Sequence, residues 1–150
     1  MTCAFTGPRP QNLPILLDPK PMAYFDLYRR LLKETTLLCK QGVTDFYCGM
    51  ALGCDLLFAE IVIGLKKAYP IKLHAAVPFR GQPDAWNRAD RALYTFLLER
   101  CDSAVAFMRH IRKAAAWNVA CITLEPLNVN GFTCQFSDLA HFGTASLVCQ

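Results

Sequence analysis

The sequence lacks any apolar run long enough to cross a bilayer, and it has no lysine or arginine after Lys113. The longest apolar stretch, Leu56 to Leu65, falls short of the roughly 20 residues that a spanning helix needs and carries Glu60 near its middle. The N-terminus has no basic segment followed by an apolar stretch and a cleavage site, so no secretory signal is predicted. These absences favour a cytoplasmic protein with no membrane partner.

Paired metal ligands are also missing. The sequence contains eight cysteines, but no two are spaced as C-x-x-C and none clusters with His74, His110 or His141. Structural zinc sites need ligand pairs about two to four residues apart. No metal site is therefore predicted, and most of the cysteines are interpreted as small buried apolar side chains kept reduced in the cytosol.

What is present indicates a folded domain. With 150 residues, of which 53% are apolar and 19% charged, the chain can bury a core of its own and is not disordered. We therefore expect a single domain over residues 1–150. The formal net charge of +4 does not by itself indicate a nucleic-acid partner, and Arg29, Arg30, Lys66 and Lys67 are interpreted as solvated helix faces.

Apolar periodicity predicts strands that alternate with helices up to Met108. The expected strands are Thr2–Thr6, Val43–Cys48, Ile71–Val77 and Ala104–Met108, and the expected helices are Met22–Gln41, Leu56–Tyr69 and Pro83–Arg100. The buried stripe is expected to comprise Phe25, Tyr28, Leu31, Leu32, Thr35 and Leu38 on the first helix, and Trp86, Ala89, Leu93, Phe96 and Leu97 on the third. Regular alternation favours right-handed crossovers, and hence an α/β, Rossmann-like three-layer domain with a mainly parallel sheet.

Beyond Met108 the patterns weaken. The nearest matches are a helix over Ile111–Val119 and strands over Ala120–Leu124 and Phe132–Phe136. The charge distribution also changes here, because all 16 Lys and Arg residues lie at or before Lys113. We expect residues 109–150 to be a divergent tail that makes the C-terminal part atypical or truncated.

Three loops follow the carboxyl ends of the first three strands, at Thr6–Pro10, Gly49–Asp55 and Pro78–Gln82. Ligands of open α/β sheets bind at this edge. The second loop leads into a helix, whose free N–H groups and positive dipole end favour phosphate, and Gly49 and Gly53 permit positive φ. The sequence thus predicts a nucleotide or nucleotide-derived ligand. The expected ligand-binding residues are Thr6, Gly7, Arg9, Gly49, Met50, Ala51, Gly53, Asp55, Pro78, Phe79 and Gln82.

Two carboxylates in this region have alternative interpretations. Asp55 either caps the helix that follows it or accepts hydrogen bonds from a ribose or base. Glu60 lies in an otherwise apolar helix, where a buried carboxylate needs a structural partner such as Arg9 or a catalytic role. Arg9 either pairs with a phosphate or is an ordinary loop arginine. No catalytic residue is assigned; Arg9 and Glu60 are the candidates.

Other residues near the loops are less specific. Trp86 is expected in the core rather than as a stacking platform, whereas Phe79 and Gln82 are better placed to contact a base or sugar. No Ser-His-Asp or Cys-His set can be assembled from the sequence with any specificity. A basic strip interleaved with aromatic residues is also absent, so no nucleic-acid partner is expected.

Three motifs occur in order along the chain. They are Cys3-Ala4-Phe5-Thr6-Gly7-Pro8-Arg9-Pro10, then Gly49-Met50-Ala51-Leu52-Gly53-Cys54-Asp55 with Ala59-Glu60, then Pro78-Phe79 with Gln82 and Trp86. Over about residues 2–108 the chain resembles the YpsA-like family of the SLOG superfamily, which also includes the DNA-processing Smf proteins and the cytokinin-activating lysine decarboxylase-like proteins. The resemblance implies a Rossmann-like fold with a SLOG-type pocket for a nucleotide or nucleotide-sugar derivative. Pro8 departs from the pattern, because relatives usually carry histidine there.

The tail departs further from that family. After the fourth strand, relatives typically have an Arg/Asn-rich helix, an apolar strand and a Gly-Gly-Thr turn, of which His141–Thr144 is at best a remnant. The segment Ile111–Val119 looks like the product of a shifted reading frame. We hypothesise such a shift, and sequencing the coding DNA tests it: an alternate frame that encodes the missing helix supports the hypothesis, and its absence refutes it.

The loops and the resemblance together favour binding or sensing, without turnover, in a bacterial SLOG-type protein. No cofactor is assigned; the ligand candidates are a nucleotide, NAD or an ADP-ribose-like molecule. The alternative is phosphoribohydrolase-like cleavage of a nucleotide N-glycosidic bond, although the Pro-Gly-Gly-x-Gly-Thr loop of the cytokinin-activating relatives is absent. A DNA-handling role and a protein-interaction scaffold are further alternatives, and a homo-oligomer is left open.

Overall fold

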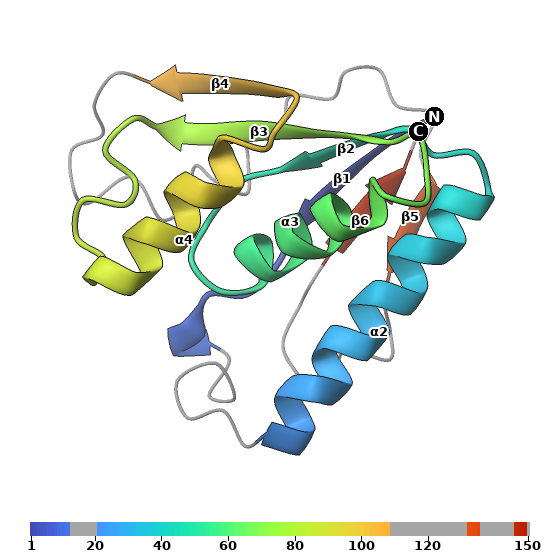
Figure 1. Cartoon of the computed structure of the whole chain (residues 1–150), viewed down its shortest axis with the longest axis horizontal. Helices are drawn as coiled ribbons and strands as arrows, with labels where there is room; N and C mark the ends of the chain where they lie inside the picture. The colour runs from blue at the N-terminus through green and yellow to red at the C-terminus, as the bar shows by residue number, and fades with distance from the viewer. Residues whose placement is uncertain (13–20, 109–131, 136–145, 150) are drawn as a thin grey trace.

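The computed structural model describes residues 1–12, 21–108, 132–135 and 146–149 (Figure 1). The strands are β1 (Thr2–Thr6), β2 (Asp45–Cys48), β3 (Lys72–Phe79), β4 (Ser103–Met108), β5 (Phe132–Gln135) and β6 (Ser146–Cys149). The helices are α2 (Pro21–Lys40), α3 (Cys54–Leu65) and α4 (Arg88–Leu98), with a short 3-10 turn at Pro10–Asn12. Strands and helices therefore alternate up to Met108, as the periodicity predicts.

The strands form one sheet in the order β4-β3-β2-β1-β6-β5. Strands β1 to β4 are parallel to their neighbours, whereas β6 pairs antiparallel with β1 and β5 pairs antiparallel with β6. The α/β class and the mainly parallel sheet are confirmed, and the arrangement is consistent with a Rossmann-like three-layer fold. The strand expected near Phe132 is present as β5, whereas no pattern predicted β6. The helix and strand expected between 111 and 124 lie outside the described residues.

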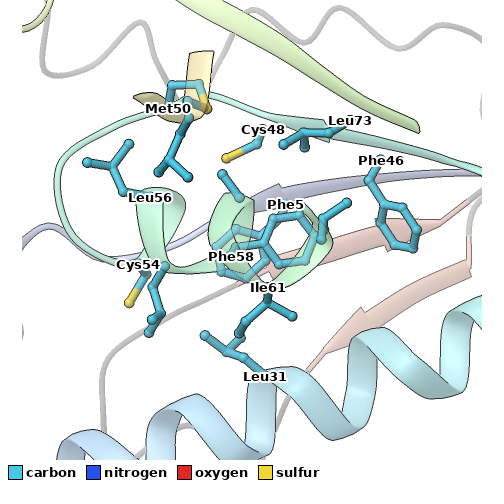
Figure 2. Packing of buried hydrophobic residues seen from close by; sticks show 14 of the residues in the cluster. Phe5, Leu31, Phe46, Cys48, Met50, Cys54, Leu56, Phe58, Ile61 and Leu73 are labelled. Carbon is cyan, nitrogen blue, oxygen red and sulfur yellow. The ribbon is translucent and has the colours of Figure 1, made fainter. Parts of the chain in front are cut away.

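The parallel strands bury alternate side chains against the helices. Helix α3 packs over the sheet and contacts α2 on one side and α4 on the other (Figure 1). Its apolar composition follows from this position, because sheet and helices together cover most of its circumference. At the centre, the ring of Phe58 stacks on Phe5 at a centroid distance of 4.3 Å and meets Phe46 edge-on (Figure 2).

The two predicted helix faces are correct only in part. On α2, Leu31, Thr35 and Leu38 are buried as predicted, whereas Phe25 is 55% exposed. On α4, Leu97 is buried as predicted, but Leu93 and Phe96 are exposed and Tyr94 is buried in their place. Apolar residues on α4 are spaced for two adjacent faces, and packing against α3 selects one of them.

The boundaries of α3 and α4 also differ from those expected. Helix α4 begins at Arg88 rather than Pro83, because Asn87 caps it by accepting a hydrogen bond from the Asp90 N–H at 2.9 Å. Trp86 precedes the cap, is partly buried against the core and meets Tyr94 edge-on, as the core interpretation predicts. Helix α3 ends at Leu65, before the predicted Tyr69. None of the helices in the described part of the chain is long and apolar enough to cross a membrane.

Candidate ligand site at the strand ends

A single buried carboxylate joins the loops after β1 and β2. The Oδ1 atom of Asp55 accepts a hydrogen bond from the Gly7 N–H at 3.0 Å, and its Oδ2 atom accepts one from the Ala51 N–H at 3.3 Å. Asp55 is only 3% exposed although it lies in the first turn of α3. Gly7 and Asp55 are 48 residues apart in the chain, and this side chain bonds to both loops.

The loop after β3 is tied to the same place by Gln82. Its Nε2 donates hydrogen bonds to the carbonyl oxygens of Gly49, at 3.2 Å, and Met50, at 2.5 Å. The side-chain Oε1 atom of Gln82 is buried and has no hydrogen-bond partner among the described residues. All three loops predicted from the sequence are thus linked into one hydrogen-bonded junction, centred on the turn from Gly49 to Asp55.

The backbone of this turn needs glycine. Gly53 is the residue before α3 and has φ 105° and ψ −125°, a conformation that residues with a Cβ rarely adopt. Met50 also has positive φ, at 55°, while its side chain is fully buried, so only its backbone is at the junction. Gly7 is required for close packing, because a Cβ at this position would lie 2.5 Å from the Cβ of Cys54.

Burial determines the protonation of Asp55. Desolvation raises the pKa of this carboxyl from 3.8 to about 6, although the hydrogen bonds from Gly7 and Ala51 and the charge of Arg9 act in the opposite direction. The capping interpretation is wrong: the cap residue of α3 is Gly53, with no side-chain cap, and both Asp55 oxygens bond to loop N–H groups. Each oxygen accepts one of these bonds and can accept another, so the ribose or base interpretation stays a prediction.

The premise that Glu60 is buried is wrong. Glu60 is exposed on α3; the pKa of Tyr24 on α2 is raised first by burial and then by the charge of Glu60. The carboxylate that is buried on α3 is Asp55. A structural or catalytic partner is therefore not required to compensate for burial of Glu60, and the pairing of Glu60 with Arg9 stays a prediction.

The remaining predicted site residues border the junction along the chain. Thr6 is the exposed last residue of β1, and Pro78 and Phe79 are the last two residues of β3, both half-buried. Arg9 lies close enough to Asp55 for its charge to lower the pKa of the carboxyl. The N–H of Cys54 donates to the Pro8 carbonyl at 3.4 Å, a further link between the first loop and α3.

Sequence reasoning missed a polar set at the other end of the strands. His74 Nδ1 lies 2.7 Å from Ser103 Oγ, and His74 Nε2 lies 3.0 Å from Asp45 Oδ1. Hydrogen bonds from Thr44 and His74 lower the pKa of Asp45. The set crosses β2, β3 and β4, and only the register of these strands could have revealed it, since the three residues are far apart in the sequence.

Cysteine, histidine, aspartate and glutamate are the side chains that could hold a metal ion. Among the residues whose positions are described, no three of these side chains lie close enough together to do so. The described cysteines, at positions 3, 39, 48, 54 and 101, form no disulfide, and burial raises the pKa of Cys54 to about 12. Cys48 donates a hydrogen bond to the backbone carbonyl of Asp55 at 3.2 Å, which adds to the packing beneath the junction.

Comparison with known proteins gives the family. The family model YpsA, described as the YspA SLOG family, matches residues 3–116. The chain belongs to the YpsA SLOG family. The match includes all three motifs and continues past β4, beyond the region over which the motifs resemble the family.

The relatives of this YpsA-family chain are bacterial. It is 31% identical over 100 residues to a UPF0398 protein of Bacillus pumilus, covering 66% of this chain and 53% of the relative. It is 32% identical over 102 residues to a UPF0398 protein of Staphylococcus epidermidis, covering 67% and 54%. With a UPF0398 protein of Halalkalibacterium halodurans, identity is 39% over 71 residues, covering 47% and 38%. The chain spans about half the length of the curated relatives it matches.

Proposed function

We propose that this protein binds or senses a nucleotide or nucleotide-derived ligand, such as ADP-ribose or NAD, at the loops after β1, β2 and β3. The observation that carries the proposal is the junction in which Asp55 and Gln82 join all three loops at the start of α3. Ligands of open α/β sheets bind at the carboxyl ends of strands, where helix N-termini favour phosphate. Membership of a SLOG family supports the same choice.

The conformation of the turn adds support. A backbone with positive φ at Gly53 lets the chain approach an anion without an intervening Cβ. Preorganised loops also bind a ligand at a lower entropic cost than loops that must be ordered first. We further propose a bacterial, cytoplasmic setting, and the bacterial origin of the relatives named above supports the bacterial part of this proposal.

A thermal-shift screen tests the proposal. The purified chain is heated with AMP, ADP, ATP, NAD and ADP-ribose, one at a time. A ligand at about 100 times its dissociation constant stabilises the folded state by about 2.7 kcal/mol, which raises the melting temperature measurably. An increase with at least one of these molecules is expected. Melting that is unchanged by all of them refutes the proposal and favours a scaffold role.

Two glycine variants locate the binding. Gly53→Ala and Gly42→Ala each force a Cβ into positive φ, at 105° and 93° respectively. A strained backbone of this kind costs about 1–3 kcal/mol at each residue. Gly42 follows α2 at the opposite ends of the strands and has open space around its Cβ position. We expect both variants to melt earlier than wild type, but only Gly53→Ala to lose the ligand-induced shift; equal shifts in both place the ligand elsewhere.

Turnover is examined separately. Incubation of the binding nucleotide with the protein, followed by analysis for released free base, distinguishes a sensor from an N-glycoside hydrolase. We expect no free base, because the carboxylate brought into the junction has both oxygens bonded to backbone N–H groups while Glu60 is exposed. Release of base that is lost in Glu60→Gln would establish the hydrolase instead.

A further inference from the structure

One titratable side chain controls the contact between two of the three loops. In its ionised form Asp55 presents only acceptors, and each oxygen receives one backbone N–H, from Gly7 and from Ala51. Protonation turns one of these oxygens into a hydroxyl and removes the negative charge. A hydroxyl oxygen is a weaker acceptor than a carboxylate oxygen, so the hydrogen bond that it receives from the loop is weakened or lost.

The charged and titratable groups around the Asp55 carboxyl keep their charge state near pH 6, whereas Asp55 itself changes charge there. Arg9, in the loop after β1, acts on the carboxyl through its positive charge. The thiol of Cys48 lies on β2, and that of Cys54 lies on α3; burial raises the pKa of both, so both stay protonated near neutral pH. Desolvation of Asp55 moves its own pKa to about 6, inside the range that cells and buffers reach.

We propose that the ionised Asp55 carboxylate holds the loops after β1 and β2 in the binding arrangement, so that acidification weakens ligand binding. The inference rests on the proposed function, because it assigns a regulation to the same site. Asp55 is a positioning residue: it acts on the ligand through the backbone of the loops and does not contact it. The negative charge of Asp55 also repels an anionic ligand, and this repulsion acts against the effect of the ordered loops on binding.

A measurement without ligand tests whether protonation of Asp55 changes its hydrogen bonds to the two loops. The amide protons of Gly7 and Ala51 are followed by NMR in the isotope-labelled full chain between about pH 8 and about pH 5. We expect both resonances to move with one midpoint near pH 6, and the movement to be absent in Asp55→Asn. Asp102→Asn is the matched control, because Asp102 also accepts a backbone hydrogen bond, from Leu73 at 2.7 Å, but is largely exposed.

The control must leave the titration of Gly7 and Ala51 unchanged. Absence of a common midpoint in wild type, or its loss in Asp102→Asn, overturns the proposal. The wild-type titration decides this point even if Asp55→Asn fails to fold.

A binding measurement tests the consequence for the ligand. ADP-ribose and NAD are the probes, because a phosphate monoester would itself titrate near pH 6 whereas their phosphate diesters keep their charge. Calorimetry at about pH 7.5 and about pH 5 should show wild-type affinity falling at least about tenfold in acid, as expected for loss of one hydrogen bond to a charged group. Asp55→Asn should bind weakly at both pH values.

The outcomes separate the two proposals. Binding of either probe with an affinity independent of pH overturns the inferred control and leaves the proposed function intact. Tighter binding in acid, together with tighter binding by Asp55→Asn at neutral pH, shows that charge repulsion dominates and also overturns it. If neither probe nor any other nucleotide binds at either pH, the proposed function fails, and the inferred control of binding fails with it.

Discussion

The buried carboxylate of Asp55 should contribute less to the stability of the protein at neutral pH than in mild acid. The perturbation is Asp55→Asn, which keeps the size of the side chain and removes its charge. Asparagine retains one acceptor oxygen but turns an N–H₂ group toward one of the two loop N–H groups, and this mismatch costs about 1–3 kcal/mol. That cost does not change with pH, so the pH dependence isolates the charge.

The magnitude follows from the shift in pKa. In the unfolded chain the carboxyl has its ordinary value of 3.8, and in the folded protein its pKa is raised to about 6. Between these values the folded state holds more protons than the unfolded state, so the free energy of unfolding falls as pH rises. A shift of about two units corresponds to about 3 kcal/mol, present below about pH 4 and lost above about pH 6.

Urea denaturation of both proteins between about pH 4 and about pH 8 measures the effect. The difference in unfolding free energy, wild type minus Asp55→Asn, should decrease by about 3 kcal/mol as pH increases through this window. Titration of Asp45 and Asp102, whose pKa values are lowered, is common to both proteins and cancels. A difference that stays constant, or that increases with pH, refutes the assignment of a raised pKa to Asp55.

Two further stability predictions, one on packing and one on helix capping, use the same denaturation assay. Phe58→Ala removes a fully buried ring stacked on Phe5 and should lower the free energy of unfolding by about 3–5 kcal/mol. Phe96→Ala removes an exposed ring and should lower it by less than about 1 kcal/mol; similar losses in both variants would contradict the described core. Asn87→Ala removes the side chain that accepts the Asp90 N–H at the start of α4 and should cost about 1 kcal/mol. Asn87→Asp keeps an acceptor and should stay close to wild type, and a loss equal to that of alanine would argue against capping.

The proposed role of Asp55 implies a conflict between function and stability within one side chain. Its ionised form orders the loops after β1 and β2, yet burying that charge lowers the free energy of unfolding. Residues that cost stability without improving packing are expected at functional sites. The conflict therefore supports the interpretation of the junction as a site rather than as part of the core.

The candidate site could be located from sequence because its signals are local. Gly49 and Gly53 lie between an apolar strand and an apolar helix, and this order alone predicts a turn that opens a helix. Parallel strands place such turns at one edge of a sheet, so the three loops could be expected to meet. Strands β1 to β4 and the helices between them were likewise predicted from the periodicity of apolar residues along the chain.

Which carboxylate is buried could not be read from those patterns. Asp55 and Glu60 lie on the same apolar helix, and periodicity favoured Glu60 because its neighbours in sequence are apolar. Burial depends on which side of α3 faces the loops and the sheet, and the loop residue Gly7 that bonds Asp55 is 48 residues away. The same reason explains α4, where Tyr94 and Leu97 are buried although Leu93 and Phe96 have equally suitable spacing.

By itself, then, the sequence determined the order of strands and helices up to Met108, the glycine turn at Gly53 and the edge at which the loops lie. The tertiary structure alone decided the antiparallel pairing of β6 with β1, the burial of Asp55 and the link from Gln82 to the turn. Helical and strand periods act over a few residues, and so they are visible in any short window. Pairing, burial and loop contacts depend on which distant segments pack together, and no local window contains that information.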